Sequence, residues 1–284
     1  MKILKTVKEV KEEVKSWKEQ GLQIGLVPTM GWLHEGHLSL IKNARENNDR
    51  VAVSIFVNPM QFGPDEDFDS YPRDLERDAK LCEEAGVDLI FAPQPEEMYP
   101  NGFCSYVDMN GLTGGLCGKS RPIHFRGVQT VVNKLFNIVT PDNAYFGEKD
   151  TQQLAVIKRM VLDLNMNVKI CGCPIIREED GLAKSSRNSY LSPEERALAP
   201  IINKAMTAGK EMIIKGERDS AKVIKAISDI ILSVGVTKID YVSIVDSLTL
   251  EPVEKIESDI LCACAVYMGT SARLIDNFSL EIKG

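Results

Sequence analysis

Gly25-Leu-Val-Pro-Thr-Met-Gly-Trp-Leu-His-Glu-Gly-His37 is the stretch of sequence that decides the fold. The apolar run from Leu22 to Val27 predicts a β-strand, which breaks at Pro28. A loop containing Gly31 follows, and apolar residues at helical spacing from residue 38 onward predict an amphipathic helix that begins near His34. The stretch is therefore a strand–loop–helix unit that carries the pattern His-x-Gly-His at the helix N-terminus.

The two histidines of this pattern suit the binding of an anion. His34 and His37 lie three residues apart, so both side chains leave the same face of the first helical turn. The free N–H groups and the helix dipole favour negative charge there, and Gly36 lets a ligand approach the backbone closely. The combination suits a nucleoside triphosphate whose α-phosphate is attacked. Two histidines at a helix start also occur as structural groups or as metal ligands.

Composition and charge narrow the class of protein. The chain has 284 residues, enough for one large domain or two of ordinary size, and is 44% hydrophobic and 26% charged, as in soluble globular proteins. Its net charge of −7 argues against non-specific binding to nucleic acid or to anionic membranes, although a local basic pocket for phosphates is compatible with it. The apolar runs are too short to span a bilayer, and residues 7–20 predict a charged helix rather than a signal peptide. We expect a cytoplasmic protein.

The cysteines do not predict a disulfide framework. Their number, seven, is odd, and the chain is fairly large. Cys171 with Cys173, and Cys262 with Cys264, lie two apart in apolar runs, so each pair falls on one face of a strand. A four-thiolate metal site is the alternative, but these pairs lack the spacing of zinc knuckles. We therefore expect buried, inert thiols and assign no metal ligand on the protein.

Apolar runs alternate with helical patterns as far as Ile176. The expected strands are 22–27, 51–57, 87–92, 143–146 and 168–176, and the expected helices are 38–47, 73–85, 128–139 and 151–164. Such alternation predicts an α/β fold, a Rossmann-like doubly wound parallel sheet with helices on both faces. Ligands of such sheets bind beyond the carboxyl ends of the strands. We therefore expect the site to be built from the loops Pro28–His37, Asn58–Gly63 and Gly147–Asp150.

The pattern changes after Ile176. A polar loop, Arg177–Ser192, leads to a helix start at Ser192-Pro193. Two helices are expected at 193–215 and 220–233, followed by strands at 238–245, 260–268 and 273–282. Helices followed by strands indicate a smaller C-terminal α+β domain. We expect domains at 1–176 and 177–284, the second acting as a lid whose polar loop covers the cleft.

Further clusters occur along the chain in a fixed order. They are Val57-Asn58-Pro59-Met60-Gln61-Phe62, His124-Phe125-Arg126-Gly127-Val128, Phe146-Gly147-Glu148-Lys149-Asp150, Gln152-Gln153-Leu154 and Asp180-Gly181-Leu182-Ala183-Lys184-Ser185-Ser186-Arg187-Asn188. Together with residues 28–37, this ordered set closely resembles the pantoate–β-alanine ligases over essentially the whole chain. The resemblance implies a homodimeric enzyme of the nucleotidyltransferase superfamily that couples (R)-pantoate to β-alanine with ATP. The reaction would pass through a pantoyl-adenylate and release AMP and pyrophosphate.

The resemblance also implies roles in the nucleotide site. The positions implied for ATP binding are Met30, Gly31, Trp32, Leu33, His34, Glu35, Gly36, His37, Gly147, Glu148, Lys149, Asp150, Ile176, Lys184, Ser185, Ser186 and Arg187. His34, His37 and Lys149 would act on the phosphates, with His37 as the proton donor if one acts. Lys149 is a compact cation suited to the α-phosphoryl oxygens, and Asp150 suits the ribose hydroxyls. Without the other motifs, residues 147–150 also fit a simple polar turn.

The acid substrates and the remaining phosphates involve other residues. Pantoate and β-alanine would contact Gln61, Gln153, Asn58 and Met30, because neutral amides can both donate to a carboxylate and accept from hydroxyls. Exposed glutamines are also common at protein surfaces.

Ser185, Ser186 and Arg187 offer two hydroxyls and a cation for the β- and γ-phosphates. Lys184 stands where relatives are expected to have methionine. Arg126 would contribute to the phosphate cleft, with a surface ion pair as the alternative. The triphosphate implies Mg²⁺, whose ligands would come mostly from its own oxygens.

Two other functions fit part of the same pattern. A nucleotidyltransferase that ends at an adenylylated or cytidylylated product would share His34 to His37, and so would a non-catalytic nucleotide-binding module. Gln61 and Gln153 favour the ligase, because together they predict a carboxylic-acid site. The retention of both histidines and Lys149 argues against the non-catalytic module.

Overall fold

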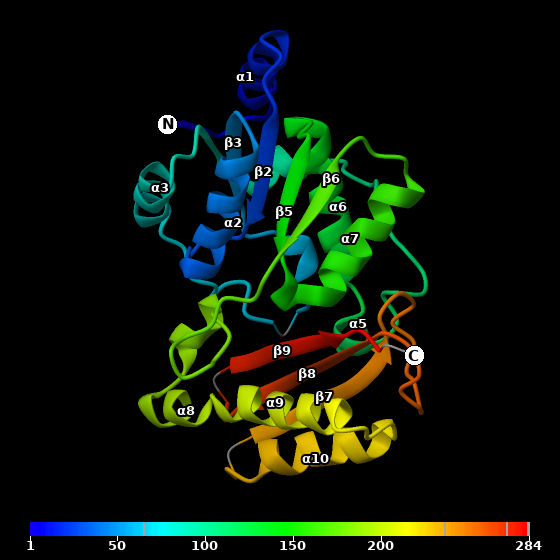
Figure 1. Ribbon diagram of the computed structural model, residues 1–284. Helices are drawn as coiled ribbons and strands as arrows, with labels where there is room; N and C mark the ends of the chain where they lie inside the picture. The colour runs from blue at the N-terminus through cyan, green and yellow to red at the C-terminus, as the bar shows by residue number, and fades with distance from the viewer. Residues whose placement is uncertain (65, 236, 271, 283–284) are drawn as a thin grey trace. The chain divides into compact units, whose positions relative to one another are not determined.

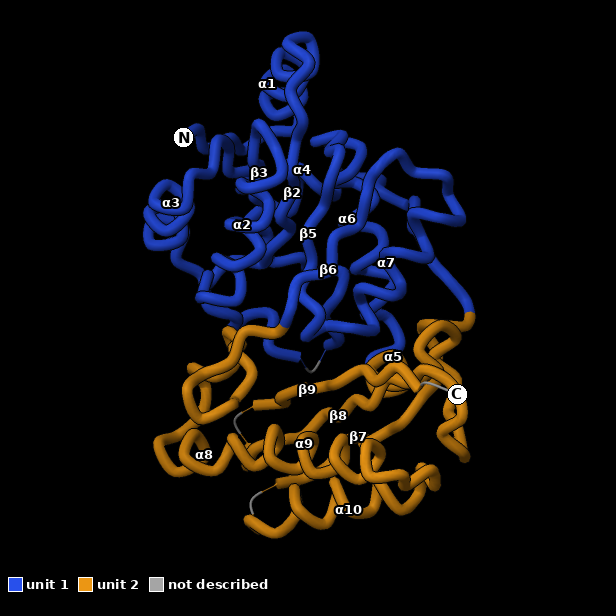
Figure 2. Tube along the Cα trace, in the orientation of Figure 1, with its two compact units in different colours: residues 1–110, 121–174 blue, residues 111–120, 175–284 orange. Residues whose placement is uncertain are grey.

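The computed structural model describes residues 1–64, 66–235, 237–270 and 272–282. The chain divides into two compact units (Figure 2). The first contains residues 1–110 and 121–174, and the second contains residues 111–120 and 175–284. The segment 111–120 thus groups with the second unit, although in the sequence it lies between the two parts of the first unit.

Among the described residues, the first unit forms a six-stranded sheet in which all neighbouring strands are parallel (Figure 1). The strand order is β1-β4-β3-β2-β5-β6. The strands are β1 (Lys2–Leu4), β2 (Ile24–Thr29), β3 (Arg50–Ile55), β4 (Leu89–Phe91), β5 (Asn143–Gly147) and β6 (Lys169–Cys173). The α-helices are α1 (Val7–Glu19), α2 (Glu35–Asn47), α3 (Leu75–Glu84), α4 (Pro95–Met98), α6 (His124–Val139) and α7 (Thr151–Asp163), and the 3₁₀ turns are η1 (Pro59–Gln61) and η2 (Glu148–Asp150).

Alternation along the strands divides the core of this unit into two layers. Leu26 packs with buried residues of α1, α6 and α7, whereas its neighbour Val27 packs with α2 and α3. Ala144 and Tyr145 of β5 divide in the same way. Successive side chains of a strand point to opposite faces, so helices cover both faces of the sheet. The predicted doubly wound parallel sheet is confirmed.

The strand order reverses direction at β2. The chain runs outward from β2 through β3 to β4, and β5 then returns to pair with the other side of β2. This is the switch point at which ligands of open α/β sheets bind, beyond the carboxyl ends of the strands. The loop after β2 carries the His-x-Gly-His pattern, and the turn after β5 carries Lys149.

The second unit is built around an antiparallel sheet. Within its described part, β7 (Thr237–Asp246), β8 (Ile260–Met268) and β9 (Ala272–Leu280) pair in the order β7-β8-β9. Helices α9 (Ile201–Ile214) and α10 (Ser220–Leu232) pack on it through a shared apolar core. The shorter elements are α5 (Leu116–Ser120), η3 (Ser186–Tyr190) and α8 (Pro193–Leu198).

One expected helix is divided in the structure. The sequence pattern predicted a single helix over 193–215, but α8 ends at Leu198 and α9 begins at Ile201. Pro200 lies between them, and a proline removes a backbone N–H and clashes with the preceding turn inside a helix. Strand β1 and the short helices α4 and α5 were not predicted, because runs of three to five residues give too little periodicity.

Candidate active site

The two histidines of the pattern cap helix α2. His34 is the N-cap residue, and its Nδ1 accepts a hydrogen bond from the Gly36 N–H at 3.1 Å. Nδ1 of His37 accepts from the His34 N–H at 3.3 Å, and the two ring centroids lie 4.1 Å apart. A neutral imidazole that accepts at Nδ1 carries its proton on Nε2. Both rings therefore have an Nε2–H donor that is not used in capping.

His37 is held in its neutral form. Exclusion of water lowers the pKa of His37 to about 3, and the neighbouring His34 and Lys149 act in the same direction. Asp150 opposes this shift only weakly. At neutral pH the ring is therefore a neutral hydrogen-bond donor rather than an imidazolium acid.

Lys149 brings positive charge to the same corner of the sheet. It lies in η2, directly after β5, and its Nζ is 3.1 Å from Oδ2 of Asp150. Strand β5 pairs in parallel with β2, so the loops that follow the two strands lie at the same edge of the sheet, and Lys149 and Asp150 both act on the pKa of His37. The polar turn at residues 147–150 thus adjoins the His-x-Gly-His helix, as expected from the parallel strands.

The loop after β3 adds an amide pair. Asn58 is 1% exposed and Gln61 is 8% exposed. Asn58 Nδ2 donates to Gln61 Oε1 at 3.1 Å, while Gln61 Nε2 lies 3.0 Å from Met30 Sδ. Tyr99 donates to Asn58 Oδ1 at 2.7 Å. Asn58 therefore orients the Gln61 amide, and Gln61 connects the loop after β3 to the loop after β2.

The start of α6 supports Gln61 through two residues that the sequence analysis did not assign. His124 is buried, and its Nδ1 donates to the Gln61 carbonyl oxygen at 3.0 Å. A Cβ atom at Gly127 would lie 2.2 Å from the Met60 carbonyl oxygen, so only glycine allows this approach. Both belong to the cluster at residues 124–128 that the sequence made visible, but only Arg126 was singled out there.

Gln153 and Arg126 are the two other residues that the sequence assigned to the substrates. Gln153 is half-buried in the first turn of α7. Nε of Arg126 lies 3.9 Å from Asp108 Oδ2, and its guanidinium lies 4.7 Å from the centroid of the Tyr106 ring. This is the surface ion pair that the sequence left open, and the phosphate role of Arg126 stays a prediction.

Ion pairs and a backbone hydrogen bond hold the first part of the polar loop of the second unit in place. Arg177 makes a bidentate ion pair with the buried Asp276 of β9, with N–O distances of 2.7 and 2.9 Å. Lys184 donates its backbone N–H to the Ile176 carbonyl, and its Nζ lies 2.9 Å from Glu178 Oε2.

The segment that follows, from Ser185 to Arg187, lies at the start of a 3₁₀ turn. Ser185 caps η3 by accepting from the Arg187 N–H at 3.3 Å. Ser186 is buried within the same turn. This local structure places the two serines and Arg187 on one tight turn of the second unit.

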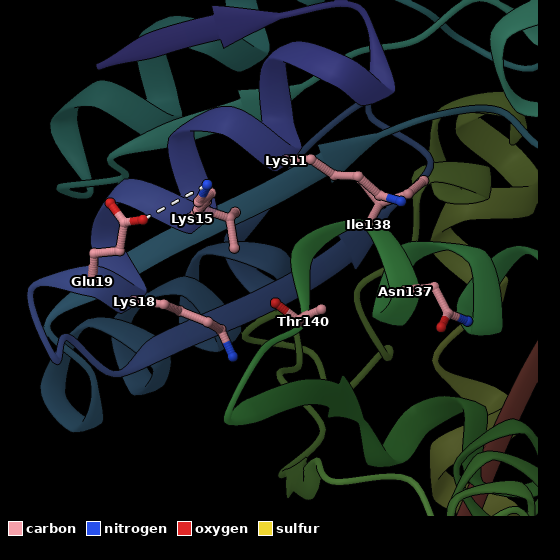
Figure 3. Close-up of a pocket in the computed structure, with 8 residues that line it drawn as sticks. Lys11, Lys15, Lys18, Glu19, Asn137, Ile138 and Thr140 are labelled. Carbon is pink, nitrogen blue, oxygen red and sulfur yellow. Dashed lines mark ion pairs between the residues drawn. The ribbon is translucent and has the colours of Figure 1, made fainter.

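A hollow of about 570 Å³ occurs elsewhere in the first unit (Figure 3). Its lining comes from α1 and the end of α6: Lys11, Val14, Lys15, Lys18, Glu19, Asn137, Ile138 and Thr140. The lysine side chains project from α1 at its edge, and Lys15 pairs with Glu19 at 3.8 Å. It shares no residue with the motifs above, so the candidate site rests on the loops at the strand ends.

The described residues form neither a metal cluster nor a membrane-spanning helix. Within residues 1–64, 66–235, 237–270 and 272–282, no group of three or more His, Cys, Asp or Glu residues is arranged to hold a metal ion. No helix in that part of the chain has the length and apolarity needed to cross a membrane. Cys262 and Cys264 are buried free thiols, and burial raises the pKa of each.

The fold and the site define a class of protein. A doubly wound parallel sheet with an imidazole-capped helix N-terminus and a lysine at its switch point is a nucleotide-binding α/β protein. Residues 2–279 match the family model described as pantoate-beta-alanine ligase. The chain belongs to the pantoate–β-alanine ligase family.

Individual relatives agree with this assignment. Pantothenate synthetase of Enterococcus faecalis is 61% identical over 283 residues, covering 100% of both chains. The enzyme of the same name from Ruminiclostridium cellulolyticum is 61% identical, with 98% and 99% covered. The crystal structure of pantothenate synthetase from Thermus thermophilus has a TM-score of 0.91 at 48% identity, covering 98% of this chain and 99% of that one. A pantoate-beta-alanine ligase from Francisella tularensis, complexed with beta-gamma ATP and beta-alanine, has a TM-score of 0.80 at 37% identity, covering 98% and 97%.

The lowered pKa values of His124 and His37 predict that the folded state loses stability in acid. Burial lowers the pKa of His124 to about 4, and the pKa of His37 is about 3, whereas both rings titrate near 6.5 in the unfolded chain. Between these values the unfolded state binds more protons, so stability is present above pH 6.5 and is lost as the pH falls. We expect the free energy of unfolding to drop by up to about 1.4 kcal/mol per pH unit from His124, and by less from the half-buried His37.

Urea titrations at several pH values between 7 and about 4 measure this slope. His124→Gln is the informative variant, because its amide can still donate to the Gln61 carbonyl but does not titrate. A slope that is the same in His124→Gln and in the parent would contradict the assignment to His124.

Proposed function

We propose that this protein condenses (R)-pantoate with β-alanine at the expense of ATP, through a pantoyl-adenylate, with release of AMP and pyrophosphate. Membership of the family supports the overall reaction. The observation that carries the nucleotide chemistry is the pair of imidazoles capping α2, with Nε2–H donors beside Lys149. Attack of a carboxylate on an α-phosphate needs positioning and neutralisation of charge rather than an enzyme nucleophile, and these groups supply both.

Each residue then has a physical role in the proposal. His34 and His37 donate hydrogen bonds to the phosphate oxygens, and Lys149 neutralises the charge that develops on the α-phosphoryl group. Residues 30–37 and 147–150 surround the nucleotide, with Asp150 at the ribose. Gln61, oriented by Asn58, and Gln153 hold the pantoate.

Product analysis tests the reaction directly. The protein is incubated with ATP, Mg²⁺, (R)-pantoate and β-alanine, and the products are identified by mass spectrometry. We expect pantothenate, AMP and pyrophosphate in equal amounts, with pantothenate formed only when β-alanine is present. Accumulation of a stable adenylylated product that β-alanine does not consume would instead indicate a nucleotidyltransferase.

The proposal includes Mg²⁺, a homodimer and a cytoplasmic location. Mg²⁺ prefers hard oxygen ligands, which the triphosphate provides, and it would neutralise phosphate charge during the attack. Asp150 is an oxygen donor of the right class, but its carboxylate already lies 3.1 Å from the Lys149 ammonium. We therefore assign the metal to the phosphates and no ligand to the protein.

The glutamine pair gives a prediction on substrate specificity. Gln61→Ala or Gln153→Ala should raise the KM for pantoate at least about tenfold while the KM for ATP changes less than about twofold, since each removes a hydrogen bond to the acid. Initial rates with each substrate varied in turn measure this. An equal rise in the KM for ATP with an unchanged KM for pantoate would remove the residue from the acid pocket.

The polar loop at residues 180–188 gives a prediction on the two half-reactions. We propose that this loop, part of the C-terminal lid, orders on the triphosphate and protects the adenylate from water. Arg187→Ala should slow adenylate formation at least about tenfold, because it removes a charge from the β- and γ-phosphates. Amide formation from preformed pantoyl-adenylate should stay within about twofold, since those phosphates have then left.

Lys184→Met is the matched control in the same loop. It removes a cation that pairs with Glu178, and Glu178 remains partly exposed to water, so both half-reactions should be nearly unchanged. Single-turnover measurements separate the two steps. Equal damage to both steps by Arg187→Ala would contradict the phosphate role and indicate a general disruption of the loop.

A further inference from the structure

A buried carboxylate on α3 holds the loop that precedes the His-x-Gly-His helix. Asp78 is 0% exposed, and its Oδ2 accepts from the Trp32 N–H at 2.7 Å while its Oδ1 accepts from the Leu33 N–H at 2.8 Å. Burial raises the pKa of Asp78, and the two N–H donors oppose that effect. Hydrogen bonds from backbone N–H groups to an ionised carboxylate are among the strong ones in proteins.

The loop needs such support because its backbone is strained. Gly31 has φ +85° and Trp32 has φ +50°, so two successive residues lie in the left-handed region. Glycine adopts this region readily, whereas a residue with a Cβ does so only when the surroundings impose it. The two N–H groups that Asp78 accepts from belong to Trp32 and to the residue after it.

The neighbouring residue Arg77 also binds this loop. Its NH2 group donates to the Leu33 carbonyl oxygen at 2.8 Å, and its NH1 group lies 3.2 Å from Asp78 Oδ1. Its guanidinium also lies 4.9 Å from the centroid of the Trp32 ring. Adjacent residues of one helix thus bind both the donor and the acceptor of Leu33 and cover the side chain of Trp32.

The position of this loop sets the position of the histidines. Leu33 directly precedes His34, and the His34 N–H is the donor to His37 Nδ1. A rotation of the peptide between Leu33 and His34 would therefore turn the donor that orients His37 and move the N-cap ring of His34. Misplacement of catalytic groups by about 1 Å can lower a rate by about two orders of magnitude.

We propose that Asp78 and Arg77 are positioning residues that hold the loop Gly31–Leu33 so that His34 and His37 present their Nε2–H groups to the triphosphate. The inference rests on the proposed function. It assigns to α3 a part in the first half-reaction, exerted through the backbone of Trp32 and Leu33. Gln61 meets this loop at Met30, whereas Asp78 and Arg77 bind the backbone of Trp32 and Leu33, so we expect the affinity for pantoate to change less than the rate.

Asp78→Asn tests the role of the carboxylate. The amide keeps the size of the side chain but replaces one acceptor oxygen with a donor, so one of the two loop N–H groups loses its partner. We expect the kcat of pantoate-dependent ATP–pyrophosphate exchange to fall about 20-fold or more, while the KM for pantoate changes less than about twofold. Arg77→Gln should give a smaller loss of the same kind, about fivefold, because it removes contacts at the exposed side.

A spectroscopic signal reports on the loop independently of activity. The chain has two tryptophans, and in a Trp17→Phe background the fluorescence of Trp32 comes from the loop itself. Asp78→Asn should shift its emission maximum and lower its steady-state anisotropy. Asp74→Ala is the matched control: Asp74 caps α3 through the Arg77 N–H and has no contact with the loop among those described above, so it should lower the melting temperature and leave both signals unchanged.

The outcomes separate the inference from the proposed function. Absence of exchange in the parent protein with pantoate would mean that the proposed function has failed. If the parent is active, the inference is overturned by an Asp78→Asn variant with unchanged fluorescence and less than about threefold loss of kcat, or by an equal loss in Asp74→Ala. If Asp78→Asn does not fold, Arg77→Gln decides: an unchanged kcat and unchanged Trp32 signal in this variant would overturn the inference.

Discussion

His37→Ala should lower the rate of adenylate formation by about two orders of magnitude or more, and His34→Ala by a similar factor. This is the scale of loss when a preorganised donor to a developing charge is removed. The pKa of His37, about 3, means that the ring acts as a neutral donor, so the rate should not depend on its protonation between about pH 6 and 8. Single-turnover formation of pantoyl-adenylate measures the effect.

The capping role of the histidines requires a control for folding. His34→Ala removes an N-cap acceptor as well as the proposed donor to phosphate, and loss of a cap costs about 1 kcal/mol. His34→Asn keeps an N-cap acceptor for the Gly36 N–H but lacks the Nε2–H group. We expect this variant to melt at the temperature of the parent and to be as slow as His34→Ala. Normal activity per folded molecule in His34→Asn would show that His34 is a structural cap only.

Gly127→Ala should damage both stability and the acid site. The new Cβ would meet the Met60 carbonyl oxygen at 2.2 Å and the Gln61 Cα at 2.6 Å, and backbone atoms cannot move aside as a flexible side chain can. Either α6 or η1 must shift, and Gln61 moves with it. Overpacking of this kind costs about 1–3 kcal/mol. Displacement of Gln61 should lower kcat/KM for pantoate by about two orders of magnitude.

Thermal melting and initial rates measure the two effects of Gly127→Ala. Gly115→Ala is a suitable control, because among the described residues a Cβ there would meet only the Leu250 carbonyl oxygen, at an ordinary 3.9 Å. That variant should match the parent in both measurements. A Gly127→Ala protein with the parent's melting temperature and KM for pantoate would show that η1 does not depend on the close approach.

Sequence patterns predicted the sheet and the place of the site because both depend on local periodicity. Strand β2, helix α2 and the break between them follow from one apolar run, one proline and a helical spacing. The parallel sheet then brings the ends of β2, β3 and β5 to one edge, which predicts that Gln61 and Lys149 lie near the histidines. The contact between Gln61 and Met30 confirms this for the loops after β2 and β3.

The parts that could not be predicted depend on contacts between residues distant in sequence. Asp78 looks like any acidic residue of an exposed helix until the structure places its carboxylate on Trp32 and Leu33, which lie 45 or more positions earlier. The support of Gln61 by His124 joins residues 63 positions apart. The reciprocal capping by His34 and His37 was also missed, because histidine is not among the usual N-cap residues.

The central claim is that the His-x-Gly-His site activates the carboxylate of pantoate on ATP, and ATP–pyrophosphate exchange tests it most directly. The assay uses labelled pyrophosphate, ATP and Mg²⁺ without β-alanine, and one carboxylic acid at a time from a panel of small acids. We expect exchange with (R)-pantoate and none with the other acids, and we expect the exchange to be lost in His37→Ala. If a protein shown to be folded gave no exchange with any acid of the panel, that result would contradict this role of the site.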